Sequence, residues 1–242
     1  QAADPDPQVF PRATWFLERV YHNHSHWLTA HLPKLILLKQ RDDLADILLP
    51  REPSRVMLES IAMLGIPAER FRTFDPARPV AVSELALVST DRFGPSRVRS
   101  VRSAFAGEGN APNRKVFISR ANSRGRKLLN EETLWPMLEK RGFERVLMER
   151  LSFREQVAMM RETRVLLAPH GAGLTNMIFM PEGGHVIEMA DPGFPNPNFY
   201  ALACALGLDY WLIDVEATDA DHPLDRDLFA DPDEVMDVLD RA

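Results

Sequence analysis

The chain has one cysteine, few tyrosines and no apolar stretch long enough to cross a bilayer. A single cysteine, Cys204, excludes an internal disulfide and favours a reducing compartment, and its apolar helical surroundings predict a buried thiol. A membrane span needs roughly 18 to 20 consecutive apolar residues, and no segment approaches that length. No segment is typical of a secretory leader, and the chain begins at Gln1 rather than Met, which leaves a preceding segment open.

Several functional signatures are also missing. No Gly-x-Ser-x-Gly occurs, which argues against a serine esterase. The dinucleotide fingerprint Gly-x-Gly-x-x-Gly is incomplete because Asn176 stands in place of its third glycine, which argues against an NAD-dependent oxidoreductase. Basic residues are not interleaved with aromatic residues and no nucleic-acid-binding motif is present, so no nucleic-acid partner is expected.

The 242 residues suffice for one large or two small domains. Residues 1–11 contain three prolines and predict an irregular lead-in. From residue 46 onward, strand and helix patterns alternate, which predicts an α/β fold with parallel sheets and helices on both faces. The loop at 107–113, rich in Gly, Asn and Pro, predicts a boundary between an N-terminal domain, 1–110, and a C-terminal domain, 111–242.

The net charge of −6 conceals an uneven distribution. Residues 214–242 carry 11 acidic and two basic side chains, whereas residues 92–127 carry ten basic side chains and one acidic. The basic region suits a small polyanionic ligand, and a solvated basic face is the alternative. The acidic region contains two Asp-x-Asp patterns, 219–221 and 225–227, which resemble a metal site but arise easily in so acidic a segment.

A glycine turn follows a strand pattern at residues 165–168. The turn, His170-Gly171-Ala172-Gly173, leads into a short helix-compatible segment, and a second strand pattern ends near Glu188. Glycines let a backbone approach a bulky anion, and a helix start directs N–H groups at it, so the segment suits a phosphate cradle. A turn that serves only to reverse the chain is the alternative.

A basic loop follows the strand pattern at residues 115–119. Arg120, Arg124, Arg126 and Lys127 cluster where that strand ends, which indicates an anionic ligand because like charges repel. Arginine also suits a bidentate grip on phosphate oxygens. Asn130, at the end of the loop, is expected either to contact the ligand or to cap the helix at 131–141.

Three alternate histidines, His22, His24 and His26, precede a helical apolar pattern. A metal site is disfavoured because no acidic or thiol ligand lies nearby and a helix would scatter the three rings. His26, beside Trp27, is expected to face a cleft as a proton acceptor or hydrogen-bond donor, and a helix-capping role is the alternative.

These segments together resemble the family 61 glycosyltransferases. The blocks that match in order and spacing are Ile118-Ser119-Arg120, Arg126-Lys127, Asn130-Glu131, Leu151-Ser152-Phe153, His170-Gly171-Ala172-Gly173-Leu174-Thr175-Asn176, Phe179-Met180-Pro181, Ile187-Glu188 and, near the N-terminus, His26-Trp27 with Leu32-Pro33. Lys127 departs from the second arginine usual in the family, which keeps the charge but loses the planar fork.

The resemblance implies a GT-B-like fold, in which two Rossmann-like halves with parallel sheets face each other across a cleft. It implies inverting transfer of a sugar, without a metal or other cofactor, from a nucleotide-sugar donor, UDP-linked by expectation, to a hydroxyl of a glycan or polysaccharide. The N-terminal domain would face the acceptor and the C-terminal domain would bind the donor. A non-catalytic nucleotide-binding module of the same fold is the alternative. A cytoplasmic, bacterial protein would fit the single cysteine, although eukaryotic relatives of the family are lumenal.

The resemblance also assigns roles to residues. His26 would be the catalytic base, with Asp91 as the alternative. Glu188 would accept hydrogen bonds from ribose hydroxyls, or else pair with a nearby basic group. The residues expected at the donor and its diphosphate are Arg120, Arg126, Lys127, Asn130, His170, Gly171, Ala172, Gly173, Thr175, Asn176 and Glu188.

Overall fold

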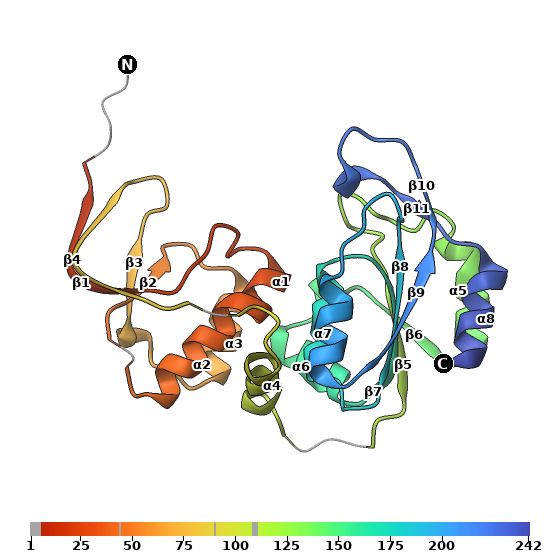
Figure 1. The fold of residues 1–242 in the computed structure, drawn as a ribbon, viewed down its shortest axis with the longest axis horizontal. Helices are drawn as coiled ribbons and strands as arrows, with labels where there is room; N and C mark the ends of the chain where they lie inside the picture. Colours follow the sequence, from red (N-terminus) through yellow and green to blue (C-terminus); the bar gives the residue numbers. More distant parts are fainter. Residues whose placement is uncertain (1–5, 44, 90, 108–110) are drawn as a thin grey trace. The chain divides into compact units, whose positions relative to one another are not determined.

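The structure, a computed structural model, describes residues 6–43, 45–89, 91–107 and 111–242 and divides into two compact units, 1–92 and 93–242 (Figure 1). Each unit contains its own parallel sheet, which confirms the predicted α/β class with two Rossmann-like halves. The predicted boundary at 110 falls where residues 108–110 lie outside the described residues, so it stays a prediction. The division between the compact units comes earlier, ahead of helix α4 (Pro95–Ala104).

The first unit has a four-stranded parallel sheet in the order β3-β2-β1-β4. Its elements are β1 (Gln8–Trp15), α1 (His24–His26), a π-helix (Trp27–His31), α2 (Leu32–Gln40), β2 (Ile47–Pro50), α3 (Arg55–Met63), a 3₁₀ turn (Ala68–Arg70), β3 (Phe71–Phe74) and β4 (Val80–Leu87). Every residue of β2 is buried, as expected of a strand inside a parallel sheet.

The prediction of an irregular lead-in at residues 1–11 was wrong for its described part, because β1 begins at Gln8 and lies inside the sheet. The strand escaped detection because its first half is mostly exposed and interrupted by Pro11. Proline is tolerated there because β1 pairs with β4 along its length but with β2 only at Thr14, so the missing N–H can face the open side.

The second unit has a five-stranded parallel sheet in the order β6-β5-β7-β8-β9. Its elements are α4, β5 (Arg114–Ile118), α5 (Glu131–Lys140), β6 (Phe143–Val146), a 3₁₀ turn (Met148–Arg150), α6 (Phe153–Arg161), β7 (Thr163–Pro169), a 3₁₀ helix (Ala172–Phe179), β8 (His185–Ala190), α7 (Asn198–Leu206), β9 (Asp209–Asp214), β10 (Glu216–Ala217), a 3₁₀ turn (Pro223–Asp225), β11 (Leu228–Phe229) and α8 (Pro232–Arg241). The strands predicted at 115–119 and 165–168 and the helix predicted at 131–141 lie within one or two residues of β5, β7 and α5.

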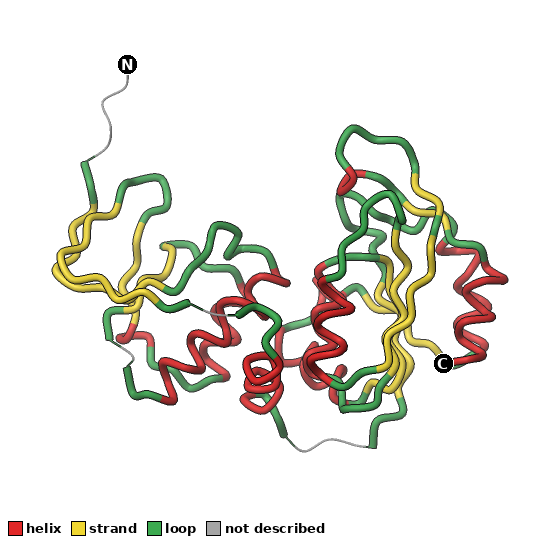
Figure 2. Tube along the Cα trace, viewed as in Figure 1, coloured by secondary structure: helices red, strands yellow, loops and turns green. Residues whose placement is uncertain are grey.

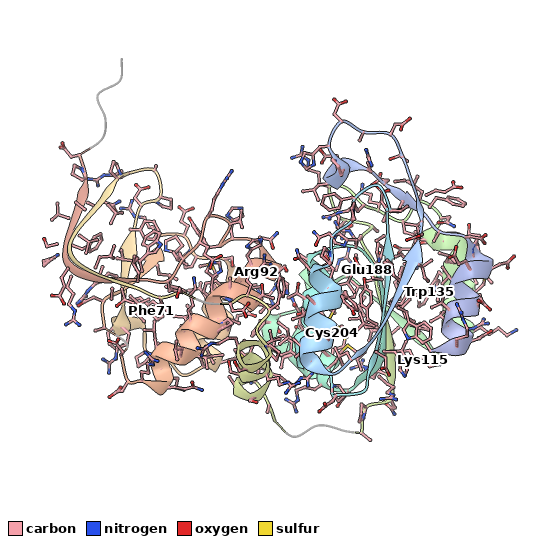
Figure 3. The ribbon with its side chains drawn as sticks, in the orientation of Figure 1. Phe71, Arg92, Lys115, Trp135, Glu188 and Cys204 are labelled. Carbon is pink, nitrogen blue, oxygen red and sulfur yellow. The ribbon has the colours of Figure 1, made fainter. Side chains whose placement is uncertain are left out.

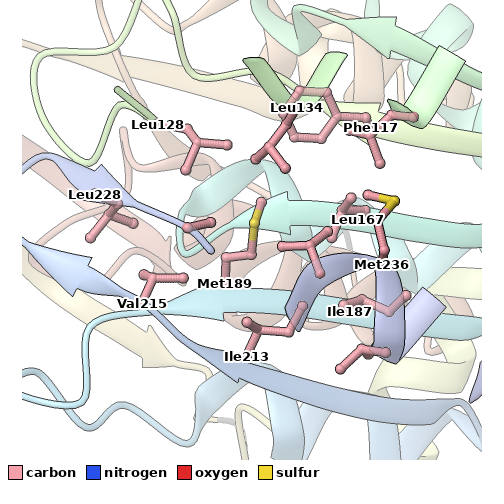
Figure 4. Close-up of a cluster of buried hydrophobic side chains, with 14 of the residues drawn as sticks. Phe117, Leu128, Leu134, Leu167, Ile187, Met189, Ile213, Val215, Leu228 and Met236 are labelled. Atoms are coloured by element: carbon pink, nitrogen blue, oxygen red, sulfur yellow. The ribbon is translucent and has the colours of Figure 1, made fainter. Parts of the chain in front are cut away.

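Helices cover both faces of this second sheet (Figure 2). On one face, side chains of α5 and α8 pack onto strand residues such as Phe117, Leu167 and Ile187, all fully buried (Figure 4). On the other face lie α4, α6, α7 and the 3₁₀ helix. Replacing a fully buried leucine of this core by alanine costs about 2–5 kcal/mol of stability. The two layers therefore hold the strand ends, and the loops on them, in fixed positions.

The prediction of a buried thiol at Cys204 was wrong, because Cys204 is exposed (Figure 3). The buried face of α7 comprises Phe199, Leu202, Ala203, Ala205 and Leu206. Cys204 lies on the opposite face with the exposed Tyr200, four residues before it. Because α7 is apolar at most positions, its sequence does not show which face of the helix is buried.

Candidate functional site

The strand order of the second unit locates a crevice. Numbered from β5, the order is 2-1-3-4-5, and the chain turns in opposite directions after β5 and after β7. Ligands of such sheets bind beyond the carboxyl ends of the two strands at this point. Arg120 follows β5 and His170 follows β7. The topology thus brings together the two segments that the sequence marks as anion-binding.

Arg120 lies directly against the glycine turn. A Cβ atom at Gly171 would stand 2.0 Å from Nη1 of Arg120, so any other residue there would displace this guanidinium. The same guanidinium donates to the carbonyl of Gly125 at 2.8 Å and to that of Arg126 at 3.1 Å. The guanidinium of Arg120 therefore occupies the space beside Gly171. The absence of a side chain at Gly171 allows this close approach, in addition to allowing the chain to turn. Gly173 is a packing glycine, since a Cβ there would lie 3.2 Å from Ile118.

Arg126 is held in an unusual backbone conformation. Its φ of +58° lies in the left-handed region, which side-chain-bearing residues adopt rarely. Its backbone N–H donates to the carbonyl of Arg226 at 2.8 Å. Its side-chain Nε is buried and has no hydrogen-bond partner among the described residues. A buried donor without an acceptor is unfavourable, which indicates a ligand with acceptor oxygens.

Burial disfavours the charged form of both guanidinium groups, and the charge of Arg126 adds to this effect at Arg120. Burial, followed by the charge of Arg126, lowers the pKa of Arg120 to about 10, and Glu149 and Asp227 offset this only in part. Burial also lowers the pKa of Arg126, against the opposing charges of Glu188 and Asp225. Neither arginine has an ion pair with a carboxylate in the part of the chain that the structure describes. A bound anion would relieve this, and the planar forks match phosphate oxygens.

His170 and Glu188 form a buried pair. Nδ1 of His170 hydrogen-bonds Oε1 of Glu188, and the hydroxyl of Tyr210 donates to Oε2 at 2.6 Å. Burial, followed by the charge of Glu188, raises the pKa of Tyr210. Phe194 and Phe199 flank the imidazole edge-on. Glu188, labelled in Figure 3, thus contacts His170 and Tyr210, the second of which no sequence pattern marks. Its expected contact with ribose hydroxyls stays a prediction.

Among the other predicted donor residues, Lys127, Asn130 and Asn176 have internal hydrogen-bond partners, whereas the buried hydroxyl of Thr175 has none among the described residues. Lys127 donates its backbone N–H to Oδ1 of Asp227 at 2.9 Å. Asn130 does not cap α5 through its side chain, as the alternative reading expected, but exchanges hydrogen bonds of 2.6 and 3.2 Å with the backbone of Ala230. Thr175 and Asn176 are fully buried in the 3₁₀ helix that Ala172 begins, and Asn176 donates to the carbonyl of Gly173 at 3.0 Å.

A cavity of about 480 Å³ opens beside this centre. It is lined by Ser119, Arg145 and Leu147 at the carboxyl ends of β5 and β6, and by Glu131 at the start of α5. Ser119 donates to both carboxylate oxygens of Glu131, at 2.7 and 2.9 Å. Ser119, which lines the cavity, directly precedes Arg120 in the chain.

The first unit carries a second polar cluster at the corresponding point of its own sheet. Its order 3-2-1-4 places that point at the carboxyl ends of β1 and β4. Beyond β1, Glu18 accepts from the buried Lys34 at 2.8 Å and donates its backbone N–H to Nε2 of His31 at 3.0 Å. Beyond β4, Arg92 donates to Thr29 at 2.9 Å (Figure 3). No site was predicted from the sequence at Glu18, Lys34 and His31. A lysine within an apolar helical run, such as Lys34, could have indicated a buried charge that needs a partner.

The two predicted base candidates lie in the same unit. His26 is half-buried in α1, and its Nδ1 is buried with no hydrogen-bond partner among the described residues. Burial, followed by the charge of Arg92, lowers the pKa of His26, which keeps its imidazole neutral at pH 7. Asp91 is exposed. Within the described ranges, no three His, Cys, Asp or Glu side chains form a group that could hold a metal ion, and no helix is long and apolar enough to cross a membrane.

Two Rossmann-like units, one with an arginine pair beside a glycine turn, place the chain in the α/β class with parallel sheets. The family profile of Glycosyltransferase 61 matches residues 24–187, more than half of the chain, and the protein belongs to this family. The match covers both the His26 segment and the turn at His170.

Two characterised relatives share parts of the chain. It is 38% identical over 90 residues to the EGF domain-specific O-linked N-acetylglucosamine transferase of Drosophila melanogaster, covering 35% of this chain and 17% of the relative. It is 35% identical over 128 residues to the beta-1,2-xylosyltransferase XAX1 of Oryza sativa subsp. japonica, covering 49% of this chain and 22% of the relative. The aligned regions thus span about a fifth of these relatives' length.

Proposed function

We propose that this protein transfers a sugar from a UDP-linked donor to a hydroxyl of a glycan or polysaccharide, with inversion and without a metal ion. The observation that carries the proposal is the pairing of Arg120 and Arg126 at the switch point of the second sheet. Two partly buried guanidinium groups that form no ion pair with a carboxylate among the described residues offer fixed positive charge to a diphosphate. The names of the two relatives, an N-acetylglucosamine transferase and a xylosyltransferase, support sugar transfer.

The reaction follows from this arrangement as a single displacement. The acceptor oxygen bonds to the anomeric carbon as the bond from that carbon to the phosphate oxygen breaks, and the electron pair leaves with the diphosphate. One displacement inverts the configuration at carbon. The arginine pair stabilises the departing charge, which is the role that a metal ion would otherwise fill.

His170 is proposed to contact a phosphate oxygen. Its Nδ1 is occupied by Glu188, so Nε2 remains for the ligand, and Glu188 with Tyr210 fixes the orientation of the ring. The backbone of Gly171, Ala172 and Gly173 lies beside it. Lys127, Asn130, Thr175 and Asn176 keep the surrounding loops in place through the hydrogen bonds and burial described above. The cavity at Ser119 and Glu131 has room for the nucleoside.

The acceptor proton is proposed to pass to His26. A base must be unprotonated at the working pH, and the lowered pKa of His26 meets this condition. Asp91, exposed on the chain beyond β4, is the alternative base. The two are separated by comparing His26→Ala with Asp91→Asn in single-turnover transfer.

The experiment that tests the function is a binding and turnover panel. Calorimetry with UDP, UDP-sugars, GDP-sugars and NAD is expected to show binding of the UDP compounds, and turnover is expected to persist in EDTA. NMR of the first product formed is expected to show the inverted anomer. Binding of NAD alone, or strict dependence of turnover on Mn²⁺, would contradict the proposal.

A non-catalytic nucleotide-binding module of the same fold is the second candidate. It predicts UDP binding with neither transfer nor UDP-sugar hydrolysis in the unmodified protein. The enzyme predicts both activities, and their loss in His26→Ala while UDP binding is retained.

A further inference from the structure

The acidic segment at 224–228 lies along the basic loop at 124–128, although a hundred residues separate them. Four hydrogen bonds from backbone N–H groups make the contact. Arg126 N–H donates to Arg226 O at 2.8 Å and Lys127 N–H to the Asp227 carboxylate at 2.9 Å. Leu228 N–H donates to Lys127 O, and Leu129 N–H to Leu228 O, both at 2.7 Å. The segment therefore runs beside the loop as an added strand would.

Gly125 shows how close this approach is. A Cβ atom at Gly125 would stand 2.4 Å from the carbonyl oxygen of Leu224, so a side chain cannot be accommodated without moving the backbone. On its other side, the loop is held by Arg120, which donates to the carbonyls of Gly125 and Arg126. The loop is thus fixed between a side chain of the proposed site and the acidic segment.

The contacts of the loop with Arg120 and with the acidic segment explain the left-handed backbone conformation of Arg126. A left-handed conformation at a residue with a long side chain costs of order 1 kcal/mol and persists only where the surroundings enforce it. The hydrogen bond from Arg126 N–H to Arg226 O and the neighbouring bond from Lys127 N–H to Asp227 supply that constraint. Together they decide where the Arg126 guanidinium stands relative to Arg120.

The contacts also account for the pattern Asp225-Arg226-Asp227. The Asp225 carboxylate lies 3.6 Å from Arg124, and Arg226 donates to Asp191 at 2.9 Å. Asp227 accepts from Lys127, and its own backbone N–H donates to Thr218 at 2.9 Å. Each side chain of the pattern is therefore engaged in holding a loop, which gives it a use other than the metal site that Asp-x-Asp suggests.

We infer that Asp227 is a positioning residue for diphosphate binding, acting by fixing the loop that carries Arg126 and not by its charge. The inference rests on the proposed function. A role through its charge and a role through its hydrogen bond predict opposite changes in UDP affinity when Asp227 is replaced. A carboxylate near an anion site repels the anion, so its removal by itself would tighten UDP binding. Loss of the hydrogen bond to Lys127 releases the loop and weakens UDP binding.

Calorimetry of UDP with the unmodified chain and two Asp227 variants tests this. Asp227→Ala removes the acceptor and is expected to weaken UDP binding about tenfold, the effect of a lost hydrogen bond to a charged group. Asp227→Asn keeps an oxygen that can accept from Lys127 N–H and is expected to bind UDP within about threefold of the unmodified chain. Asp221→Ala removes an acidic residue of the same region that takes part in none of these bonds, and serves as the matched control.

Amide hydrogen exchange supplies a readout that needs no ligand. In Asp227→Ala the amides of Arg126 and Lys127 are expected to exchange faster, while those of the β7 strand are unchanged. If Asp227→Ala fails to fold, Thr218→Val, which removes the hydrogen bond to the Asp227 backbone, is expected to show the same two effects to a smaller extent.

Unchanged or tighter UDP binding by Asp227→Ala would overturn the inference and leave the proposed function standing. Equal weakening by Asp227→Asn and Asp227→Ala would also overturn it, because the retained acceptor would then be irrelevant. Failure of the unmodified chain to bind UDP would overturn the proposed function and, with it, this inference.

Discussion

The guanidinium of Arg120 fills the space in which a side chain at Gly171 would stand. This contact joins the carboxyl ends of β5 and β7 and explains why a glycine follows His170. Its consequence is that the turn and the cation cannot be altered independently.

Gly171→Ala is expected to displace Arg120 and weaken UDP binding by about 10- to 100-fold, the cost of one strong charge-assisted contact. Calorimetry measures the change. Gly173→Ala is the comparison variant, since its Cβ would meet the side chains of Ile118 at 3.2 Å and Met148 at 4.0 Å and not Arg120. A smaller effect at Gly171 than at Gly173 would contradict the arrangement.

UDP affinity is expected to fall as pH rises through about 10. Burial, followed by the charge of Arg126, lowers the pKa of Arg120 to about 10, whereas an ordinary arginine stays charged well above that value. Deprotonation in this range removes one of the two charges on which the diphosphate depends. Binding titrations from neutral pH to just above the pKa of Arg120 should show the loss, and Arg120→Ala should bind weakly throughout with no such pH dependence.

Glu188→Gln is expected to lower the turnover rate more than it raises the KM for the donor. The amide oxygen of this variant is a weaker acceptor than the carboxylate, so the orientation of the His170 ring would be held less firmly. Tyr210→Phe removes only the second partner of Glu188 and should cost about 1 kcal/mol of stability with a minor effect on rate. Steady-state kinetics on the two variants separates these outcomes. Equal rates for both would show that the orientation of His170 is unimportant.

The first unit is expected to lose stability as the pH falls from 6.5 toward 4. Burial, followed by the charge of Lys34, lowers the pKa of His31 from 6.5 to about 4, so below pH 6.5 the unfolded chain binds a proton that the folded one refuses. The resulting loss reaches about 3 kcal/mol near pH 4. Thermal melts across this pH range should show a shallower decline in His31→Gln, whose amide oxygen can still accept from Glu18 N–H. An identical decline would rule out His31 as its source.

The sequence by itself determined the α/β class, most strands and helices of the second unit, and the residues Arg120 and His170 to Gly173 as expected neighbours of an anion. Those features are local: strand patterns, glycine turns and clusters of one charge are visible in short windows. The capping box of Ser152 and Glu155, complete in α6, is of the same kind.

Only the tertiary structure decided what these residues touch. The contact of Arg120 with Gly171, the pairing of Glu188 with Tyr210 and the hold of Asp227 on Lys127 join residues 22 to 100 positions apart. Residues 8–15 form a strand because they pair with β4. Cys204 is exposed because α7 packs its opposite face against the sheet. Hydrogen bonding and burial depend on which partners the fold brings within reach, and neither composition nor periodicity records those partners.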